Sequence, residues 1–223
     1  MKNKIFIAID TKSNEKARFI IKNSKVKNFK VGFKFGLEFL NSKNGRNFIS
    51  KLKNKIVFID LKLNDIPNTM SSTVIALKDL NINYLTVHIS SGLKALKDVK
   101  KVSGKTKIVG VTTLTSLDNA DLKSFGHKKS LKELIKLQAR LARKAKLDAI
   151  VCSPQDVRYV KRIFKKEIIT PGIRFKSKKN DQKRIMSPKE AYKQGSDWLV
   201  IGRELTNGDL KDNLRKLSDH LYK

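Results

Sequence analysis

Short apolar runs recur along this chain at a nearly constant interval, separated by stretches that mix polar and apolar residues. Each run is bounded by polar residues, a pattern typical of strands that are buried on both faces. Eight runs in 223 residues give about 28 residues per run, close to the length of one strand–helix unit. The runs are residues 5–9, 29–33, 56–61, 84–89, 108–114, 149–152, 168–169 and 198–201.

The stretches between the runs carry helical signals. After Ser130, apolar residues recur at three- and four-residue spacing, and Glu133 completes a capping box with Ser130. Ser187 and Glu190 repeat that signal, with proline at the first helical position. Strands that alternate with helices predict a parallel sheet, and eight units favour a closed (β/α)8 TIM barrel over a doubly wound sheet. We therefore expect residues 1–223 to form a single α/β barrel domain.

The chain is strongly basic, with 50 lysines and arginines against 20 aspartates and glutamates and a net charge of +30. The basic residues run through nearly every segment, aromatic residues are only 7%, and no nucleic-acid recognition motif appears. A compositional bias of the source genome explains this charge more simply than a specific nucleic-acid partner does. The positive field is expected to attract an anionic substrate.

No membrane segment or metal site is expected. The apolar run nearest the N-terminus, residues 5–9, is too short for a signal segment or a membrane span, which favours a cytoplasmic protein. The single cysteine, Cys152, excludes an internal disulfide and a thiolate metal cluster. The three histidines are far apart in the sequence, and none belongs to a pair with metal-ligand spacing.

The most informative stretch is residues 60–69, D-L-K-L-N-D-I-P-N-T, which follows the apolar residues 56–59. Side chains alternate along a strand, so Asp60 and Lys62 share a face. Asp60 and Asp65 bracket that lysine at the end of a buried strand, where burial penalises each charge and pairing restores it. Such clusters are usually kept for chemistry.

Other polar residues also lie in or after the predicted strands, and a barrel places its active site at the C-terminal strand ends. The convergence of these positions on one rim is the strongest physical argument for an enzyme. They are Asp10, Lys30, Asp60, Lys62, His88, Thr115, Arg174 and Arg203, with His88 expected in a supporting role.

The last two strands carry a phosphate-binding pattern. Gly172 and Arg174 follow the seventh run, and Gly202 and Arg203 end the eighth. Barrels often bind phosphate in these loops, where glycine lets the backbone approach the anion and arginine offers a bidentate fork. The polar segment 175–184 is expected to close over the bound phosphate.

Together these motifs resemble the bacterial form of orotidine 5′-phosphate decarboxylase, in order and over essentially the whole chain. The D-x-K-x-x-D-I-P-N-T string is highly specific. The other markers are A-I-D at 8–10, K-V-G at 30–32, V-H at 87–88, L-T-S at 114–116, V-C-S at 151–153, T-P-G-I-R at 170–174, D-Q at 181–182 with Arg184 nearby, and I-G-R at 201–203. The resemblance implies a homodimeric barrel that converts orotidine 5′-monophosphate to UMP, the last step of pyrimidine synthesis, without a metal or an organic cofactor.

The resemblance also implies roles for individual residues. Asp60 is expected beside the substrate carboxylate, Lys62 is expected to protonate C6, and Lys30 to complete the charged array. Asp65 is expected to reach into the site of a partner subunit. The implied substrate contacts are Asp10 at the ribose, Thr115 at the pyrimidine, Gln182, Gly202 and Arg203 at the phosphate with Arg174 at the same end, and Thr69, Lys30 and Asp60 elsewhere in the site.

Two positions depart from the family pattern, and two other functions stay open at this stage. Asn64 stands where many relatives carry histidine, and Glu204 where many have proline. A related metal-dependent barrel decarboxylase that acts on a keto-sugar phosphate shares the D-x-K-x-x-D pattern. A basic nucleic-acid-binding protein on a barrel without activity is the alternative from another class of function.

Overall fold

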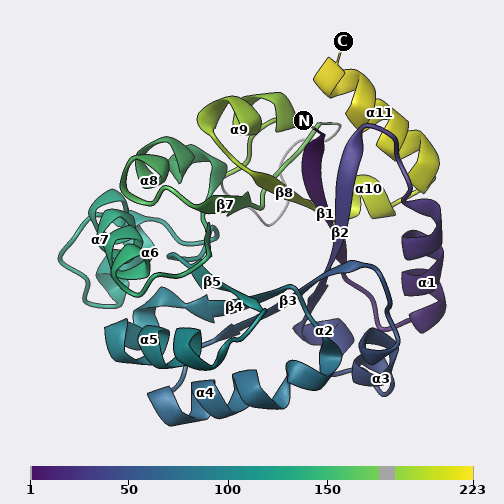
Figure 1. The fold of residues 1–223 in the computed structure, drawn as a ribbon. Coiled ribbons are helices and arrows are strands. Elements are labelled where there is room, and N and C mark those ends of the chain that lie inside the picture. Colours follow the sequence, from purple (N-terminus) through teal and green to yellow (C-terminus); the bar gives the residue numbers. More distant parts are fainter. Residues whose placement is uncertain (1, 176–183, 223) are drawn as a thin grey trace.

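Eight parallel strands close into a barrel in sequence order in the computed structural model, which describes residues 2–175 and 184–222 (Figure 1). Each strand pairs with the next along the chain, and β8 pairs with β1 to close the barrel. The predicted (β/α)8 barrel is therefore confirmed. The strands are β1 (Asn3–Ile9), β2 (Phe29–Gly36), β3 (Ile56–Leu63), β4 (Tyr84–His88), β5 (Lys107–Val111), β6 (Ala149–Val151), β7 (Glu167–Thr170) and β8 (Trp198–Ile201).

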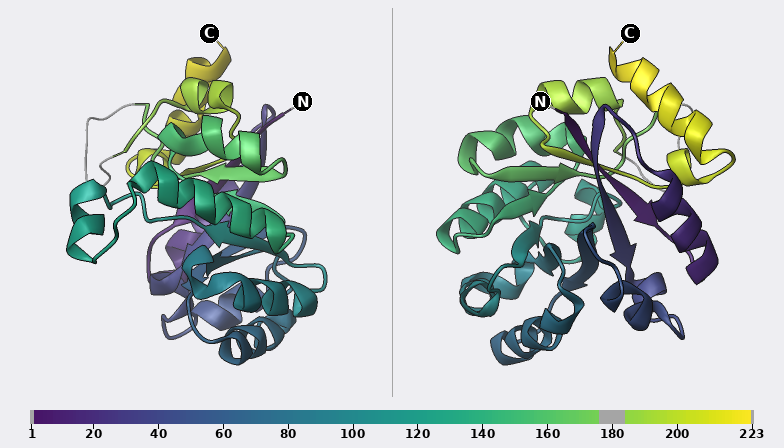
Figure 2. Two further views of the ribbon diagram at one scale, coloured as in Figure 1. Left: turned by 90° about the vertical axis from the view of Figure 1, so that its left-hand side faces the viewer. Right: turned by 45° about the vertical axis from the view of Figure 1, so that its right-hand side comes forward.

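Helices surround the barrel on its outer side (Figure 2). Both predicted capping boxes form: the Ser130 hydroxyl accepts from the Glu133 amide, and the Ser187 hydroxyl accepts from the Glu190 amide. No helix in the described residues is long and apolar enough to cross a membrane. The helices are α1 (Asn14–Asn23), α2 (Leu37–Leu40), α3 (Gly45–Ser50), α4 (Pro67–Ala76), α5 (Gly92–Val102), α6 (Asn119–Ser124), α7 (Leu131–Lys144), α8 (Val157–Ile163), α9 (Pro188–Gln194), α10 (Arg203–Thr206) and α11 (Leu210–Tyr222).

Aromatic side chains fill the N-terminal half of the barrel interior. The rings of Phe6 and Trp198 stack with their centroids 4.1 Å apart, and Phe58 and Tyr84 pack against the same Phe6 ring. Gly32 on β2 leaves room for this cluster, because a Cβ at that position would lie 2.6 Å from the Phe6 ring. A filled N-terminal half leaves the C-terminal end of the barrel as the place where side chains can meet a ligand.

Candidate active site

Four charged side chains of alternating sign lie in a row at the C-terminal ends of β1, β2 and β3. The Lys34 Nζ atom lies 3.4 Å from the Asp10 carboxylate and 3.6 Å from the Asp60 carboxylate. The Lys62 Nζ atom donates a hydrogen bond of 2.9 Å to the same oxygen of Asp60. The structure thus brings Asp10, Asp60 and Lys62 together as the sequence predicted, and it adds Lys34.

The prediction that Lys30 completes this array is wrong. Lys30 is exposed near the start of β2, in register with Lys4, whereas Lys34 lies near the end of the strand and contacts Asp60. Both lysines have even numbers and share one strand face, so alternation alone does not distinguish them. The predicted strand stopped at residue 33, whereas β2 continues to Gly36, and the K-x-G pattern occurs twice, at 30–32 and at 34–36.

The backbone at Lys62 is held in an uncommon conformation. Lys62 has a φ of 51°, and the register between β3 and β4 shifts between Ile59 and Leu63. The buried Thr86 hydroxyl accepts a 2.8 Å hydrogen bond from the Lys62 amide and donates a 3.0 Å hydrogen bond to Asp60. Left-handed backbone at a non-glycine residue carries strain and persists where its surroundings fix it. Thr86 therefore positions both Lys62 and Asp60. The sequence interpretation missed this role, although the alternation of side chains along β4 places Thr86 on the inward face of the strand.

The electrostatics favour an ionised Asp60. Burial alone would raise the pKa of this carboxyl, but the charges of Lys34 and Lys62 and the hydrogen bonds from Lys62 and Thr86 hold the pKa below its usual value. His88, at the end of β4, has a lowered pKa because it is partly buried and lies near the Lys62 ammonium, with Asp60 opposing that effect. The site therefore combines an ionised carboxylate with a histidine that favours its neutral form.

The predicted phosphate-binding residues line the same cleft as the charged row. Gly172 and Arg174 come from the segment after β7, Gly202 and Arg203 from the end of β8, and Thr115 from the loop after β5. The cleft has a volume of about 210 Å³, and it is also lined by Asp10, Lys34, Asp60 and Lys62. One cleft thus brings the charged row together with the residues that the sequence predicts to bind an anion.

Glu204, one of the two departures from the family pattern, is buried beside Arg174. Its carboxylate lies 4.0 Å from the Arg174 Nε atom and accepts a 3.4 Å hydrogen bond from the Phe175 amide. The Arg174 guanidinium also donates a 3.0 Å hydrogen bond to the Ile173 carbonyl. Glu204 therefore holds Arg174 and the adjoining backbone in place, a contact that the sequence interpretation did not foresee.

Several predicted residues do not line the cleft of this one copy. Asp65 is exposed after β3, where its carboxylate accepts a 2.7 Å hydrogen bond from the Ile66 amide, and Thr69 is exposed in the first turn of α4. Asn64 accepts a 2.8 Å hydrogen bond from the Ser91 hydroxyl. Gln182 and most of the segment expected to close over the phosphate lie outside the described residues.

The described side chains offer no ready-made metal centre. No group of three or more histidine, cysteine, aspartate or glutamate side chains within residues 2–175 and 184–222 is arranged to hold a metal ion. The chemistry that the cleft itself can support is electrostatic stabilisation and proton transfer by lysine.

Comparisons with known proteins point to one enzyme family. The sequence profile of the orotidine 5′-phosphate decarboxylase / HUMPS family matches residues 3–216. The chain is 41% identical over 222 residues to orotidine 5′-phosphate decarboxylase of Wolbachia sp. subsp. Brugia malayi (strain TRS), covering 96% of this chain and 97% of that protein. It is 39% identical over 220 residues to the Prochlorococcus marinus (strain MIT 9312) protein of the same name, covering 92% and 89%.

Solved structures give the same result. The crystal structure of orotidine 5′-phosphate decarboxylase from Lactobacillus acidophilus superposes with a TM-score of 0.84 and 27% identity, covering 100% of both chains. The corresponding decarboxylase from Methanocaldococcus jannaschii, complexed with the inhibitor BMP, superposes with a TM-score of 0.78 and 25% identity over 100% of both chains.

Proposed function

The chain belongs to the orotidine 5′-phosphate decarboxylase / HUMPS family, and we propose that the row Asp10–Lys34–Asp60–Lys62 carries out its chemistry. The chain is a carboxy-lyase that converts orotidine 5′-monophosphate to UMP in pyrimidine synthesis. The observation that supports these residue roles is the 2.9 Å contact between Lys62 and Asp60, in the same cleft as the two glycine–arginine segments.

The reaction requires a cation beside C6 of the pyrimidine ring. Breaking the bond between C6 and the carboxylate releases CO₂ and leaves the electron pair on C6, where ring resonance barely stabilises it. The Lys62 ammonium, placed beside C6, stabilises this charge as it develops and then donates the proton that forms the C6–H bond of UMP. The neutral amine of Lys62 regains its proton from water.

The neighbouring residues hold this ammonium in place. Asp60 contacts Lys62 directly, and both Lys34 and Lys62 favour the charged form of Asp60. Thr86 fixes the second carboxylate oxygen and the Lys62 backbone. These groups are oriented before the substrate arrives, so little reorganisation is required during the reaction.

The rest of the cleft fits the remainder of the substrate. Arg203 and Gly202 are assigned to the phosphate, with Arg174 held at that end by Glu204. Asp10 is assigned to the ribose and Thr115 to the pyrimidine. The assignment of Gln182 to the phosphate stays a prediction. Binding energy from the phosphate end then helps to organise the distant reactive end.

The working enzyme is proposed to be a homodimer in which Asp65 and Thr69 reach the site of the second copy. Both residues are exposed and neither lines the cleft of its own copy. Two large apolar side chains close to the site in sequence are also exposed, Leu37 by 55% and Ile66 by 65%. A second copy placed over Leu37 and Ile66 removes apolar surface from water and brings Asp65 to the facing cleft. The cytoplasmic location stays a prediction.

The direct test is to incubate the purified protein with orotidine 5′-monophosphate and EDTA and to follow the loss of the substrate's ultraviolet absorbance. Rapid conversion to UMP is expected. Failure of a folded protein to convert the substrate contradicts the assignment. Activity that EDTA abolishes supports the metal-dependent keto-sugar-phosphate decarboxylase, and salt-dependent RNA binding without decarboxylation supports the nucleic-acid-binding alternative.

A further inference from the structure

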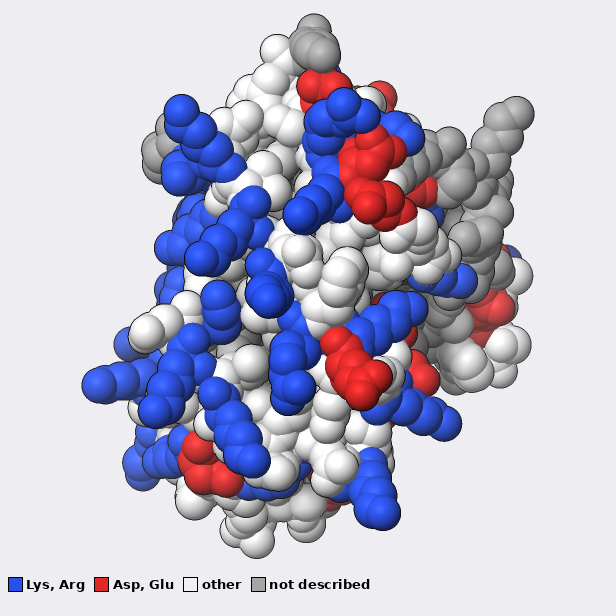
Figure 3. Space-filling view, turned by 90° about the vertical axis from the view of Figure 1, so that its right-hand side faces the viewer, with Lys and Arg blue, Asp and Glu red and all other residues white. Residues whose placement is uncertain are grey.

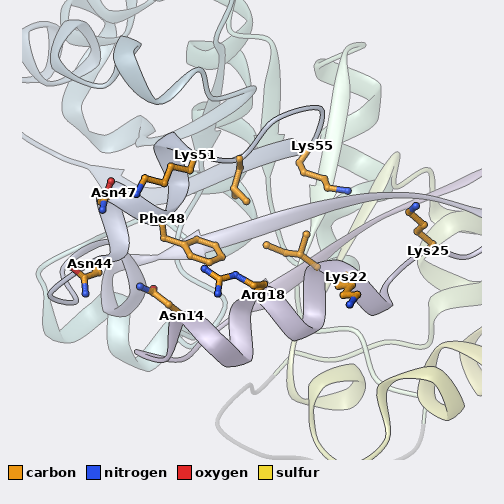
Figure 4. Close-up of a pocket in the computed structure, with 11 residues that line it drawn as sticks. Asn14, Arg18, Lys22, Lys25, Asn44, Asn47, Phe48, Lys51 and Lys55 are labelled. Carbon is orange, nitrogen blue, oxygen red and sulfur yellow. The ribbon is translucent and has the colours of Figure 1, made fainter.

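A groove on the outside of the barrel, between α1 and α3, has the features of a second binding site (Figure 4). Its volume is about 670 Å³, compared with about 210 Å³ for the active-site cleft, and the two cavities share no lining residue. The groove lies within the size range of sites for small molecules. Its lining changes in character from one end to the other.

The groove is lined by five basic residues and by no acidic residue. None of the five forms an ion pair with a carboxylate of the described residues, so their mutual repulsion is not offset there. The surrounding face, which includes α1 and α11, shows far more basic than acidic side chains (Figure 3). The five residues are Arg18, Lys22, Lys25, Lys51 and Lys55.

The middle of the groove is apolar. Ile21 and Phe48 are nearly buried and form its floor together with Leu52. The Arg18 guanidinium lies over the Phe48 ring, with its central carbon 6.0 Å from the ring centroid. Because Arg18 covers the Phe48 ring, an aromatic heterocycle would stack on the outer face of the guanidinium, beside the apolar side chains.

One end of the groove carries three side-chain amides without partners. Asn14, Asn44 and Asn47 make no side-chain hydrogen bond within the described residues, and the Asn14 Oδ1 atom is buried without a partner. Asn44 is the N-cap residue of α3, yet its side chain does not cap the helix. The Asn14 oxygen is closed off by the chain itself, whereas Asn44 and Asn47 are exposed, so their amides can both donate to and accept from a ligand in the groove.

We propose that this groove binds a nucleoside triphosphate. Figure 4 shows the three asparagines at one end, Phe48 and Arg18 in the middle, and Lys25 and Lys55 at the other end with their nitrogen atoms toward one another. This order matches a base whose edge meets the amides, whose ring stacks on the Arg18 guanidinium, and whose phosphates lie between the lysines.

A second basic groove, between α7 and α8, serves as an internal comparison. Its volume is about 730 Å³, and five basic residues line it, Lys132, Lys136, Arg140, Arg158 and Arg162. It has no asparagine, and the hydroxyl of its one aromatic residue, Tyr159, already donates to Asp156. The second groove also has two side-chain amides, Gln155 and Gln194, and two apolar residues, Ile163 and Met186. The two grooves therefore match in the number of basic residues and differ in the three asparagines and the Phe48 ring.

The test is a calorimetric titration of UTP, and separately of ATP, into the full-length enzyme saturated with UMP, which occupies the active site. One binding site per chain is expected.

Lys55→Glu should weaken binding about tenfold, as expected when a charge-assisted contact is replaced by repulsion. Arg140→Glu, the same charge change in the second groove, should leave the affinity within about twofold. Asn47→Ala should weaken UTP binding and leave the weaker binding of inorganic tripolyphosphate unchanged.

Three results overturn the proposal. They are no binding of either nucleotide, equal losses in Lys55→Glu and Arg140→Glu, and equal affinities for UTP and tripolyphosphate, of which the last two indicate general attraction of polyanions. Retained decarboxylation in each variant shows that the fold is intact. Because all three residues lie outside the active-site cleft, the result is independent of the residue roles proposed for decarboxylation.

Discussion

The Lys34 ammonium lies 3.6 Å from the Asp60 carboxylate, across the boundary between β2 and β3. Removing it leaves Asp60 buried with one lysine fewer to balance its charge. We expect Lys34→Ala to lower kcat/KM by about a thousandfold, the upper range for loss of one preorganised electrostatic group. The measurement is the steady-state rate of decarboxylation of orotidine 5′-monophosphate.

Lys30→Ala is the matched control, because Lys30 lies on the same strand and the same strand face but near the opposite end. This variant should retain activity close to that of the unmodified enzyme. A large loss in Lys30→Ala together with normal turnover in Lys34→Ala would contradict the arrangement of the charged row.

Lys62→Ala should abolish turnover while UMP binding stays largely intact. The side chain is assigned to the proton that C6 receives, and the phosphate and ribose contacts lie elsewhere in the cleft. UMP affinity measured by calorimetry, set beside single-turnover assays, separates the two effects. Unchanged turnover in a folded Lys62→Ala protein is incompatible with the mechanism.

The pattern of apolar runs predicted all eight strands, but it did not predict where β2 ends. Phe33 and Phe35 face one side of β2 and alternate with Lys34, so a lysine within the strand looked like the residue that ends it. The lysine of the charged row was therefore assigned to the K-x-G pattern at 30–32, whereas it belongs to the same pattern at 34–36, which begins with Lys34. Strand length depends on pairing with both neighbours, and Gly36 is paired with Asp60 on β3.

Other parts of the site depend on contacts between distant segments. Thr86 reaches Lys62 because the register shifts between β3 and β4, and neither strand's own sequence shows that shift. Glu204 contacts Arg174 although the two residues are thirty positions apart. The charged motif at 60–69, by contrast, is local, and alternation along one strand was enough to place Asp60 and Lys62 together.

Mixing two inactive variants tests the proposed role of Asp65 in a second copy. Asp65→Ala and Lys62→Ala should each be inactive alone. After unfolding and refolding together, random pairing makes half of the dimers mixed, each with one complete site, so about a quarter of the unmodified activity should return.

Mixing either variant with itself provides the control and should restore nothing. No recovery in the mixture, with mixed dimers shown by mass spectrometry of differently tagged chains, contradicts a contribution across the interface. An Asp65→Ala protein with full activity contradicts the role of Asp65 altogether.

Glu204→Gln should raise KM for orotidine 5′-monophosphate several-fold and leave kcat nearly unchanged. Glutamine keeps the size of the side chain but removes the charge that holds Arg174, so the phosphate end becomes less well organised. The affinity for UMP should fall in parallel, whereas the affinity for uridine should not change. A fall in kcat with constant KM is the opposite result and assigns Glu204 to the reactive end.

His88 should make the fold less stable in weak acid. Its pKa is lowered from 6.5 in the folded chain, chiefly by burial and then by the Lys62 charge, with Asp60 opposing in part. Below pH 6.5 the unfolded chain takes up a proton at His88 that the folded chain resists, so the free energy of unfolding falls as the pH falls. The stability contributed by ionised Asp60 is lost only at lower pH, because the pKa of this carboxyl in the folded chain lies below 3.8.

Urea midpoints of the unmodified protein should therefore fall between about pH 7.5 and pH 5.5, and those of His88→Gln should fall less. Identical pH dependence in the two proteins would show that His88 titrates alike in the folded and unfolded chains.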